Sequence, residues 1–279
     1  MSTAPSPPKA PPKPPAKPST PPAAAKPPPP ASTPRREVGI VTGIQQQAQR
    51  IVVYGPGGVG KTSLAALLKG ALIVDIEQRS GFLDVARAYP LTWEEMRDVL
   101  HGDCSQFAAI VIDSLTKAEE LATTWTIENV KHEKGHFVSS VEGYGFGKGL
   151  THVYETFLQL LGDLDAHIRA GRHVVCIAHE CVSNVPNPTG DDWLRYEPRL
   201  QSPGSGKNSI RHRVKEWCDH LLYLGYDTFA KDGKATGSGS RTIYPAERPS
   251  WWAKSTKLSE EIVYEKDSAE LWNQLFSKG

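Results

Sequence analysis

Nine consecutive residues have the types and spacing of a phosphate-binding loop. Residues 55–63 read Gly-Pro-Gly-Gly-Val-Gly-Lys-Thr-Ser, a full match to G-x-x-x-x-G-K-[ST]. Glycines allow φ > 0, so that successive N–H groups can converge on phosphate oxygens. The pattern predicts a site for ATP formed by Gly55, Pro56, Gly57, Gly58, Val59, Gly60, Lys61, Thr62 and Ser63.

Two residues of this loop have separate expected roles. Lys61 is expected to reach the β- and γ-phosphates, and the Thr62 hydroxyl is expected to bind Mg²⁺, a cation that prefers oxygen ligands. The flanks agree, because residues 50–54 form an apolar, β-branched run and residues 63–69 are good helix formers. A strand before the loop and a helix after it are the context that this motif requires.

Acidic residues at the ends of two apolar runs complete the predicted site. Asp113 ends the run that begins at Phe107 and is expected to hold Mg²⁺, directly or through water. Because Ser114 follows Asp113, the general base must come from elsewhere. Glu77, at the end of the run 71–76, is expected to activate water; Asp75 is the alternative. Ordinary strand-end acids remain the alternative interpretation of both positions.

His179 follows a third such run, residues 173–178. A polar side chain there can sense the γ-phosphate and transmit its presence to the next loop, although a purely structural histidine also fits the pattern. The predicted catalytic residues are therefore Lys61, Glu77, Asp113 and His179.

Strands that alternate with helices predict an α/β fold with a mostly parallel sheet and helices on both faces. Helices are expected over residues 114–132, 150–170 and 267–276, and a hairpin is expected to pair residues 220–226 with 241–244. Residues 183–213 are rich in Pro, Gly, Asn and Ser and predict a long loop.

The first 36 residues contain 15 of the 23 prolines, six Lys or Arg, and no acidic or aromatic residue. This composition predicts a disordered tail, followed by one domain over residues 37–279. The tail could contact a protein partner or nucleic acid, or serve only as a solvated tether. Because the whole chain has a net charge of +1, the remainder is net negative.

Two further features bear on localisation. No apolar run approaches the length of a membrane span. The four cysteines are scattered without a C-x-x-C pair, which indicates reduced thiols and a cytoplasmic protein.

These motifs together resemble the RecA-like ATPases, and more closely the phage-type AAA-domain proteins linked to single-strand annealing and recombination. The resemblance covers roughly residues 45–275 and is carried by residues 55–63, 73–77, 110–114, 174–180, 143–145, 241–244 and 252–254. It implies a homo-oligomer that hydrolyses ATP on single-stranded DNA, in a bacterial host cytoplasm if phage-encoded. It also implies that Lys254 or Arg241 could complete a neighbour's ATP site, although the triplet 254–256 lacks the arginine expected in the phage proteins.

The segment 183–215 is where RecA-like proteins place a DNA-binding loop. It contains the predicted DNA contacts Arg195, Arg199, Lys207, Arg211 and Arg213, with Trp193 and Tyr196 among them. Basic side chains can neutralise phosphates while aromatic rings stack on unpaired bases. A solvated surface loop is the alternative.

Three functions remain open from the sequence. The first is an ATPase stimulated by single-stranded DNA. The second is a nucleotide-dependent switch or scaffold with little turnover. The third is a small-molecule kinase, for which the chain shows no arginine-rich lid.

Overall fold

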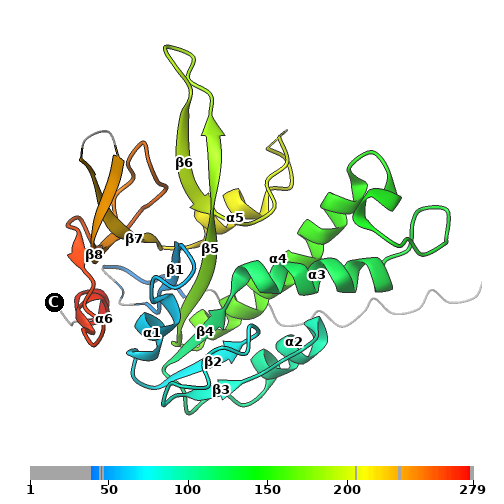
Figure 1. The fold of residues 1–279 in the computed structure, drawn as a ribbon. Helices are drawn as coiled ribbons and strands as arrows, with labels where there is room; N and C mark the ends of the chain where they lie inside the picture. Colours follow the sequence, from blue (N-terminus) through cyan, green and yellow to red (C-terminus); the bar gives the residue numbers. More distant parts are fainter. Residues whose placement is uncertain (1–38, 44, 46, 205, 232–233, 277–279) are drawn as a thin grey trace, which may run out of the picture. The chain divides into compact units, whose positions relative to one another are not determined.

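The computed structural model describes residues 39–43, 45, 47–204, 206–231 and 234–276 (Figure 1). The predicted tail, residues 1–36, lies outside the described residues. The chain divides into two units, residues 1–44 and 45–279, and the fold described below belongs to the second.

The second unit is built on one mixed sheet in the order β3-β2-β4-β5-β1-β7-β8-β9. The neighbouring strands from β3 to β7 in this order all pair in parallel, whereas β8 and β9 are added in antiparallel fashion. The strands are β1 (Arg50–Gly55), β2 (Ala71–Asp75), β3 (Ala86–Ala88), β4 (Ala109–Asp113), β5 (His173–Val185), β6 (Trp193–Pro198), β7 (His220–Lys231), β8 (Lys234–Tyr244) and β9 (Ile262–Val263).

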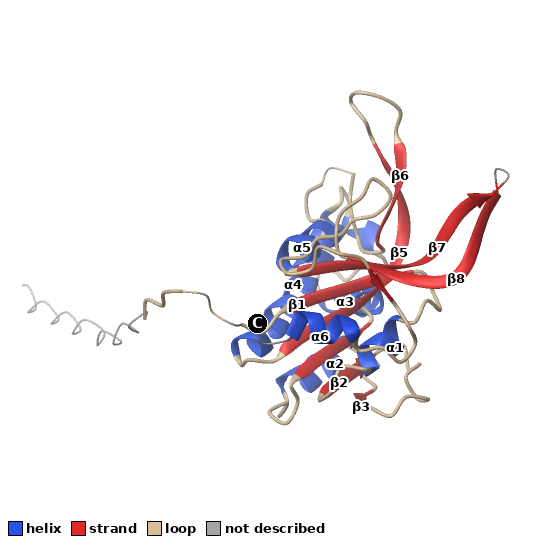
Figure 2. Cartoon of the chain, turned by 90° about the vertical axis from the view of Figure 1, so that its left-hand side faces the viewer, coloured by secondary structure: helices blue, strands red, loops and turns tan. Residues whose placement is uncertain are grey.

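Helices cover both faces of this sheet (Figure 2), which confirms the predicted fold class. Successive residues of a strand point to opposite faces. Val52 of β1 therefore packs in one core cluster, while its neighbour Val53 packs in the other. The first face is covered by α2 (Trp93–His101), α3 (Leu115–Asn129), α4 (Lys148–Arg169) and α5 (Ile210–Trp217), and the second by α1 (Lys61–Ala66) and α6 (Glu270–Phe276).

Local sequence signals account for several helix boundaries. The Thr92 hydroxyl accepts the Glu95 N–H at 3.1 Å, and the Glu95 carboxylate accepts the Leu91 N–H at 2.7 Å, so that α2 begins with reciprocal capping. Helix α4 buries Val153, Phe157 and other apolar residues at spacings of three and four, as its periodicity predicts. A short 3₁₀ helix (Val141–Tyr144) precedes it.

The predicted loop over residues 183–213 is wrong. Strand β5 continues to Val185 and pairs with β6 as an antiparallel hairpin that extends from the sheet, and α5 begins at Ile210 (Figure 1). The inward face of β6 carries Arg195 and the buried Glu197, which pair with each other at 2.6 Å, whereas Leu194 and Tyr196 face outward and are exposed. Charged residues thus take inward positions and apolar residues outward ones, which reverses the hydrophobic alternation that usually identifies a strand.

One buried histidine is expected to make the fold sensitive to acid. His220 of β7 is fully buried, its Nδ1 lies 2.7 Å from the Ser255 hydroxyl, and its Nε2 has no partner in the described part of the chain. Burial lowers the pKa of His220 from 6.5 to about 4. Protonation is thus easier in the unfolded chain, and this site's contribution to stability is lost as the pH falls from about 6.5 to about 4.

We expect His220→Gln to reduce this loss by about 1–3 kcal/mol between pH 7 and pH 4. The measurement is urea unfolding of both proteins at a series of pH values, with the exposed His136→Gln as the control. An unchanged pH slope in His220→Gln would show that other groups cause the acid sensitivity.

Candidate nucleotide-binding site

The structure brings the residues predicted for ATP binding together at one edge of the sheet. Across the parallel pairs, Gly55 lies opposite His179, and Asp113 lies opposite Ile177. Strand β5 therefore places His179 between the phosphate loop and the end of β4. A cavity of about 250 Å³ lies at this edge, and it is lined by the predicted residues Gly57, Gly58, Gly60, Lys61, Thr62, Ser63, Glu77, Asp113 and His179. Gly55, Pro56 and Val59 do not line it, whereas Arg79 and Phe82, which were not predicted, do.

The backbone of the phosphate loop has the conformation that its glycines predict. Gly58 has φ 79° and Gly60 has φ 107°, both in the region that favours glycine. A Cβ at Gly55 would fall on the Leu224 carbonyl oxygen of β7, so this position requires glycine because of a close backbone approach.

Lys61 is buried within this loop. Its Nζ donates to the carbonyl oxygens of Gly55 and Pro56, both at 2.8 Å. Burial lowers the pKa of Lys61 to about 8, so that the ammonium group is still mostly charged at pH 7. An ammonium group beside converging N–H groups fits the phosphates of a nucleotide.

Thr62 and Asp113 form an oxygen pair suited to Mg²⁺. The Thr62 hydroxyl donates to Asp113 Oδ2 at 2.6 Å, and burial raises the pKa of Asp113 to about 6. When phosphates are present, Mg²⁺ keeps several waters and takes few protein ligands. The Thr62 and Asp113 oxygens would supply those protein ligands. Among the described residues, no group of three or more His, Cys, Asp or Glu side chains is arranged to hold a metal ion.

Glu77 lines the same cavity as the phosphate loop. Its Oε1 accepts the Ser114 hydroxyl at 2.5 Å and lies 2.8 Å from His179 Nε2, while Arg79 Nη1 is 3.7 Å from Oε2. The hydrogen bond from His179 holds the pKa of Glu77 at about 2, so that Glu77 remains a carboxylate.

The alternative base, Asp75, has a structural role instead. Asp75 is fully buried, and its Oδ2 accepts the Ser80 N–H at 2.7 Å in the turn after β2. It does not line the cavity.

Comparison with known families agrees with this geometry. A family model for the AAA domain matches residues 47–256, which is most of the chain. The chain belongs to the AAA domain family. It is therefore a nucleotide-binding P-loop ATPase. A search of curated proteins found no match.

None of the described helices of this AAA domain combines the length and the apolar character needed to cross a bilayer.

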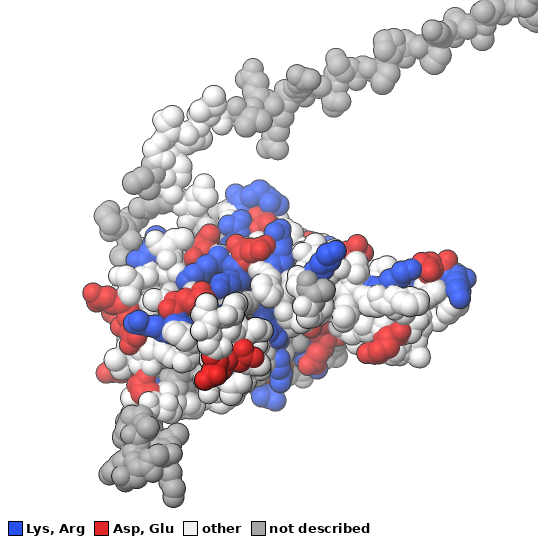
Figure 3. Space-filling view, turned by 90° about the horizontal axis from the view of Figure 1, so that it is seen from above, with Lys and Arg blue, Asp and Glu red and all other residues white. Residues whose placement is uncertain are grey.

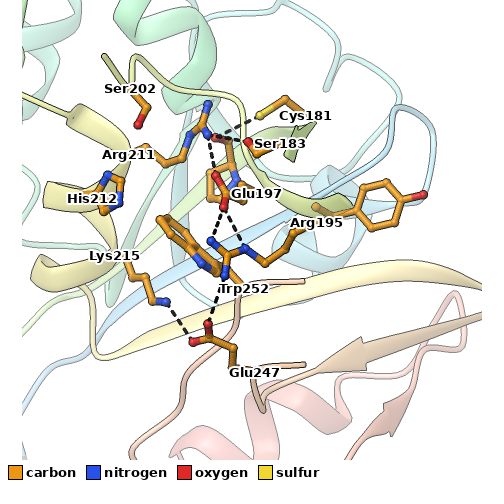
Figure 4. Close-up of polar contacts among 12 residues, drawn as sticks. Cys181, Ser183, Arg195, Glu197, Ser202, Arg211, His212, Lys215, Glu247 and Trp252 are labelled. Atoms are coloured by element: carbon orange, nitrogen blue, oxygen red, sulfur yellow. Dashed lines mark hydrogen bonds and ion pairs between the residues drawn. The ribbon is translucent and has the colours of Figure 1, made fainter. Parts of the chain in front are cut away.

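The five arginines and lysines predicted to contact DNA do not form one surface in the AAA domain. Arg195 and Arg211 both bind the buried carboxylate of Glu197, each at 2.6 Å (Figure 4). One carboxylate balances only one of these two positive charges, and Glu247, which lies 3.8 Å from Arg195, is shared with Lys215. Contact of Arg195 and Arg211 with DNA stays a prediction. The space-filling view also shows acidic and basic side chains interspersed (Figure 3).

The other three predicted DNA contacts lie apart from this pair. Arg199 lines a second cleft, beside the phosphate cavity. Lys207 and Arg213 are exposed, and Arg213 lies 4.0 Å from the carboxylate of Glu216. Their contact with DNA remains a prediction.

The resemblance implied that Arg241 or Lys254 could complete a neighbour's ATP site, and this stays a prediction. Within its own AAA domain, Arg241 Nη1 donates to the Val59 carbonyl of the phosphate loop at 2.9 Å, whereas Lys254 Nζ donates to the Glu216 carbonyl at 3.5 Å. Sequence reasoning also missed Tyr226 and Tyr264, whose hydroxyls contact the same loop. No local motif marks these residues, because they are more than 160 positions away in the chain.

Proposed function

We propose that this AAA domain hydrolyses Mg²⁺-ATP with Glu77 as the general base, and that single-stranded DNA stimulates the reaction in annealing or recombination. The observation that carries the DNA part is a second cleft of about 380 Å³ next to the phosphate cavity. The two hollows share Glu77, Arg79 and His179. A single DNA strand bound in the second cleft would contact Glu77, Arg79 and His179, the residues that we expect beside the γ-phosphate.

Each residue of the site has a defined part in this proposal. Thr62 and Asp113 supply oxygen ligands for Mg²⁺, which neutralises phosphate charge when bound. Lys61 holds the phosphates in place. Glu77 orients the attacking water and accepts its proton, while His179 sets the position of the Glu77 carboxylate.

The second cleft carries one more positive than negative charge, which suits a phosphodiester backbone. Its cationic residues are Arg79, Lys117 and Arg199, and its acidic residues are Glu77 and Glu120. Lys117 pairs with Glu120 at 2.6 Å, and the Arg79 side chain, which is 77% exposed, lies 3.7 Å from Glu77. Cationic side chains can bind successive phosphates without reading sequence. The Arg199 N–H also donates to the His179 carbonyl at 2.8 Å, so that the end of β6 contacts the proposed sensor directly.

Steady-state ATP hydrolysis with and without single-stranded DNA, at low and moderate salt, tests this function. Lys61→Ala serves as the inactive control. Clear stimulation that Lys61→Ala abolishes supports the proposal, whereas turnover indifferent to DNA, with no DNA binding at low salt, would contradict it.

Arg199→Glu is expected to lower the stimulation by single-stranded DNA at least fivefold, because it places a negative charge where a phosphate would bind. The readout is the ratio of the rates with and without DNA. Arg213→Glu is the matched comparison, because Arg213 is exposed outside the cleft. If only Arg213→Glu lost the stimulation by DNA, the DNA-binding site would have to be assigned to the surface around α5 instead of the second cleft.

A second candidate function is a nucleotide-dependent switch with little turnover. It is favoured by the hydrogen bonds from His179 and Ser114 to Glu77, which leave this carboxylate a weak base. Tight Mg²⁺-ATP binding with negligible hydrolysis, with or without DNA, would select this alternative.

The wider biological setting is also part of the proposal. The resemblance to phage-type recombination proteins supports a homo-oligomer acting in the cytoplasm, and the proline-rich tail supports an additional protein partner. Sedimentation of the full chain with and without Mg²⁺-ATP tests the oligomer.

A further inference from the structure

The outer side of the phosphate loop is bound by side chains from the C-terminal part of the chain. Three consecutive loop carbonyls each accept one hydrogen bond from such a side chain. The pairs are Tyr226 hydroxyl to Gly58 at 3.3 Å, Arg241 Nη1 to Val59 at 2.9 Å and Tyr264 hydroxyl to Gly60 at 3.3 Å. The donors come from β7, β8 and the residue after β9.

The contact from Arg241 restrains the direction of one N–H group on the other side of the loop. In a planar trans peptide, the C=O of one residue and the N–H of the next point in opposite directions. Holding the Val59 carbonyl outward therefore turns the Gly60 N–H inward. The Gly60 carbonyl also accepts the Leu64 N–H of α1 at 2.8 Å, so that Tyr264 adds to a contact that the helix already makes. Inward N–H groups are what a phosphate-binding nest needs.

We propose that Arg241, assisted by Tyr264 and Tyr226, is a positioning residue that preorganises the phosphate loop for ATP. We refer to these three residues as the loop clamp. The loop clamp reduces the conformational entropy that the phosphate loop would otherwise lose when ATP binds. This inference rests on the nucleotide binding that the proposed function requires.

Arg241 makes the strongest contact of the loop clamp. Its hydrogen bond is the shortest of the three, and its guanidinium lies over the Tyr264 ring at 4.7 Å. A Cβ at Gly60 would lie 2.9 Å from both Arg241 Nη1 and Tyr264 Cε1, which shows how closely the two side chains cover the loop. Tyr226 is 45% exposed and makes a longer bond, so its contribution should be the smallest.

Arg241→Ala is expected to weaken Mg²⁺-ATP binding about tenfold, or about 1.4 kcal/mol, in isothermal titration calorimetry of the full chain. Tyr264→Phe, which keeps the ring, should cost about two- to threefold, in keeping with a single neutral hydrogen bond. Because the clamp acts on bound ATP and the transition state alike, KM should rise while kcat stays within about twofold. Arg248→Ala is the matched control, because Arg248 is 60% exposed and pairs only with Glu261, at 3.9 Å, in the described part of the chain.

Linkage provides a second readout that a merely structural role would not change. If the clamp favours ATP binding, ATP must stabilise the clamp by the same free energy. Mg²⁺-ATP should therefore slow amide hydrogen exchange in residues 241–244 and 262–264, and Arg241→Ala should reduce this protection.

The outcomes separate this inference from the proposed function. Folded Arg241→Ala that binds Mg²⁺-ATP within twofold of the wild type overturns the loop clamp, as does failure of the wild type to bind Mg²⁺-ATP. Should Arg241→Ala fail to fold, the double variant Tyr226→Phe/Tyr264→Phe, which keeps both rings, decides the matter by the same titration. Absence of DNA-stimulated hydrolysis contradicts only the proposed function, because the loop clamp is tested by the affinity for Mg²⁺-ATP and not by hydrolysis.

Discussion

Glu77→Gln is expected to lower kcat for ATP hydrolysis by about 10²–10³, because general-base catalysis typically contributes 10²–10⁴. Glutamine retains the size and can still bond to Ser114 and His179, but it cannot take a proton from water. The Kd for Mg²⁺-ATP should change by less than about threefold, since the proposed role of Glu77 is to bind the attacking water and not the phosphates. Single-turnover hydrolysis and calorimetric titration measure the two quantities separately.

A matched acid tests whether position, and not charge alone, gives Glu77 its role. Glu120 lines the second cleft but not the phosphate cavity, and it pairs with Lys117 at 2.6 Å on the surface. Glu120→Gln should retain most of the basal rate without DNA. If Glu120→Gln lowered kcat as much as Glu77→Gln, the assignment of Glu77 as the general base would be wrong.

Lys61→Ala is expected to weaken Mg²⁺-ATP binding by about 30- to 5,000-fold. Truncating one partner of a buried, hydrogen-bonded charge pair costs about 2–5 kcal/mol, and the triphosphate would lose its buried ammonium partner. The Lys61 side chain is also preorganised, because two carbonyl oxygens already fix its Nζ at the loop. Calorimetric titration of the purified variant gives the affinity directly.

Lys69→Ala is the control for this change, because Lys69 is exposed just after the same helix. It removes one positive charge from the same part of the chain without touching the loop. If Lys69→Ala weakened binding as much as Lys61→Ala, the effect would reflect overall charge. If Lys61→Ala bound Mg²⁺-ATP with near wild-type affinity, the phosphate-loop assignment would be wrong.

The sequence predicts this site well where each signal is local. The loop at residues 55–63 is a contiguous motif, and Glu77, Asp113 and His179 each follow a short apolar run. Parallel strands bring such run ends to a common edge, and the register of β1, β4 and β5 does so here. The proximity of the phosphate loop, Asp113 and His179 could therefore be inferred although these residues lie far apart in the chain.

The sequence fails where partners are distant or where polar residues replace apolar ones. The sequence does not show that Arg195 and Arg211 both bind Glu197, because this contact joins residues of β6 and α5 that are distant in the chain. Arg241 and Tyr264 reach the phosphate loop only because β8 and β9 extend the sheet past β7. Both sets of contacts depend on tertiary structure, and no periodicity or motif in the sequence predicts either of them.

The two ends of the sheet have a consequence for how copies of this chain can associate. β3 has three residues, so this edge offers few backbone groups to another strand. The hairpin strand β6 is partly covered as well, since the Tyr196 N–H donates to the Ser250 carbonyl at 2.8 Å and its carbonyl accepts the Trp252 N–H at 3.1 Å. At the opposite end, β9 pairs with only Thr242 and Ile243 of the eleven residues of β8. A strand from another copy is therefore disfavoured at β3 and β6, and the long strand β8 is the edge at which such pairing is expected.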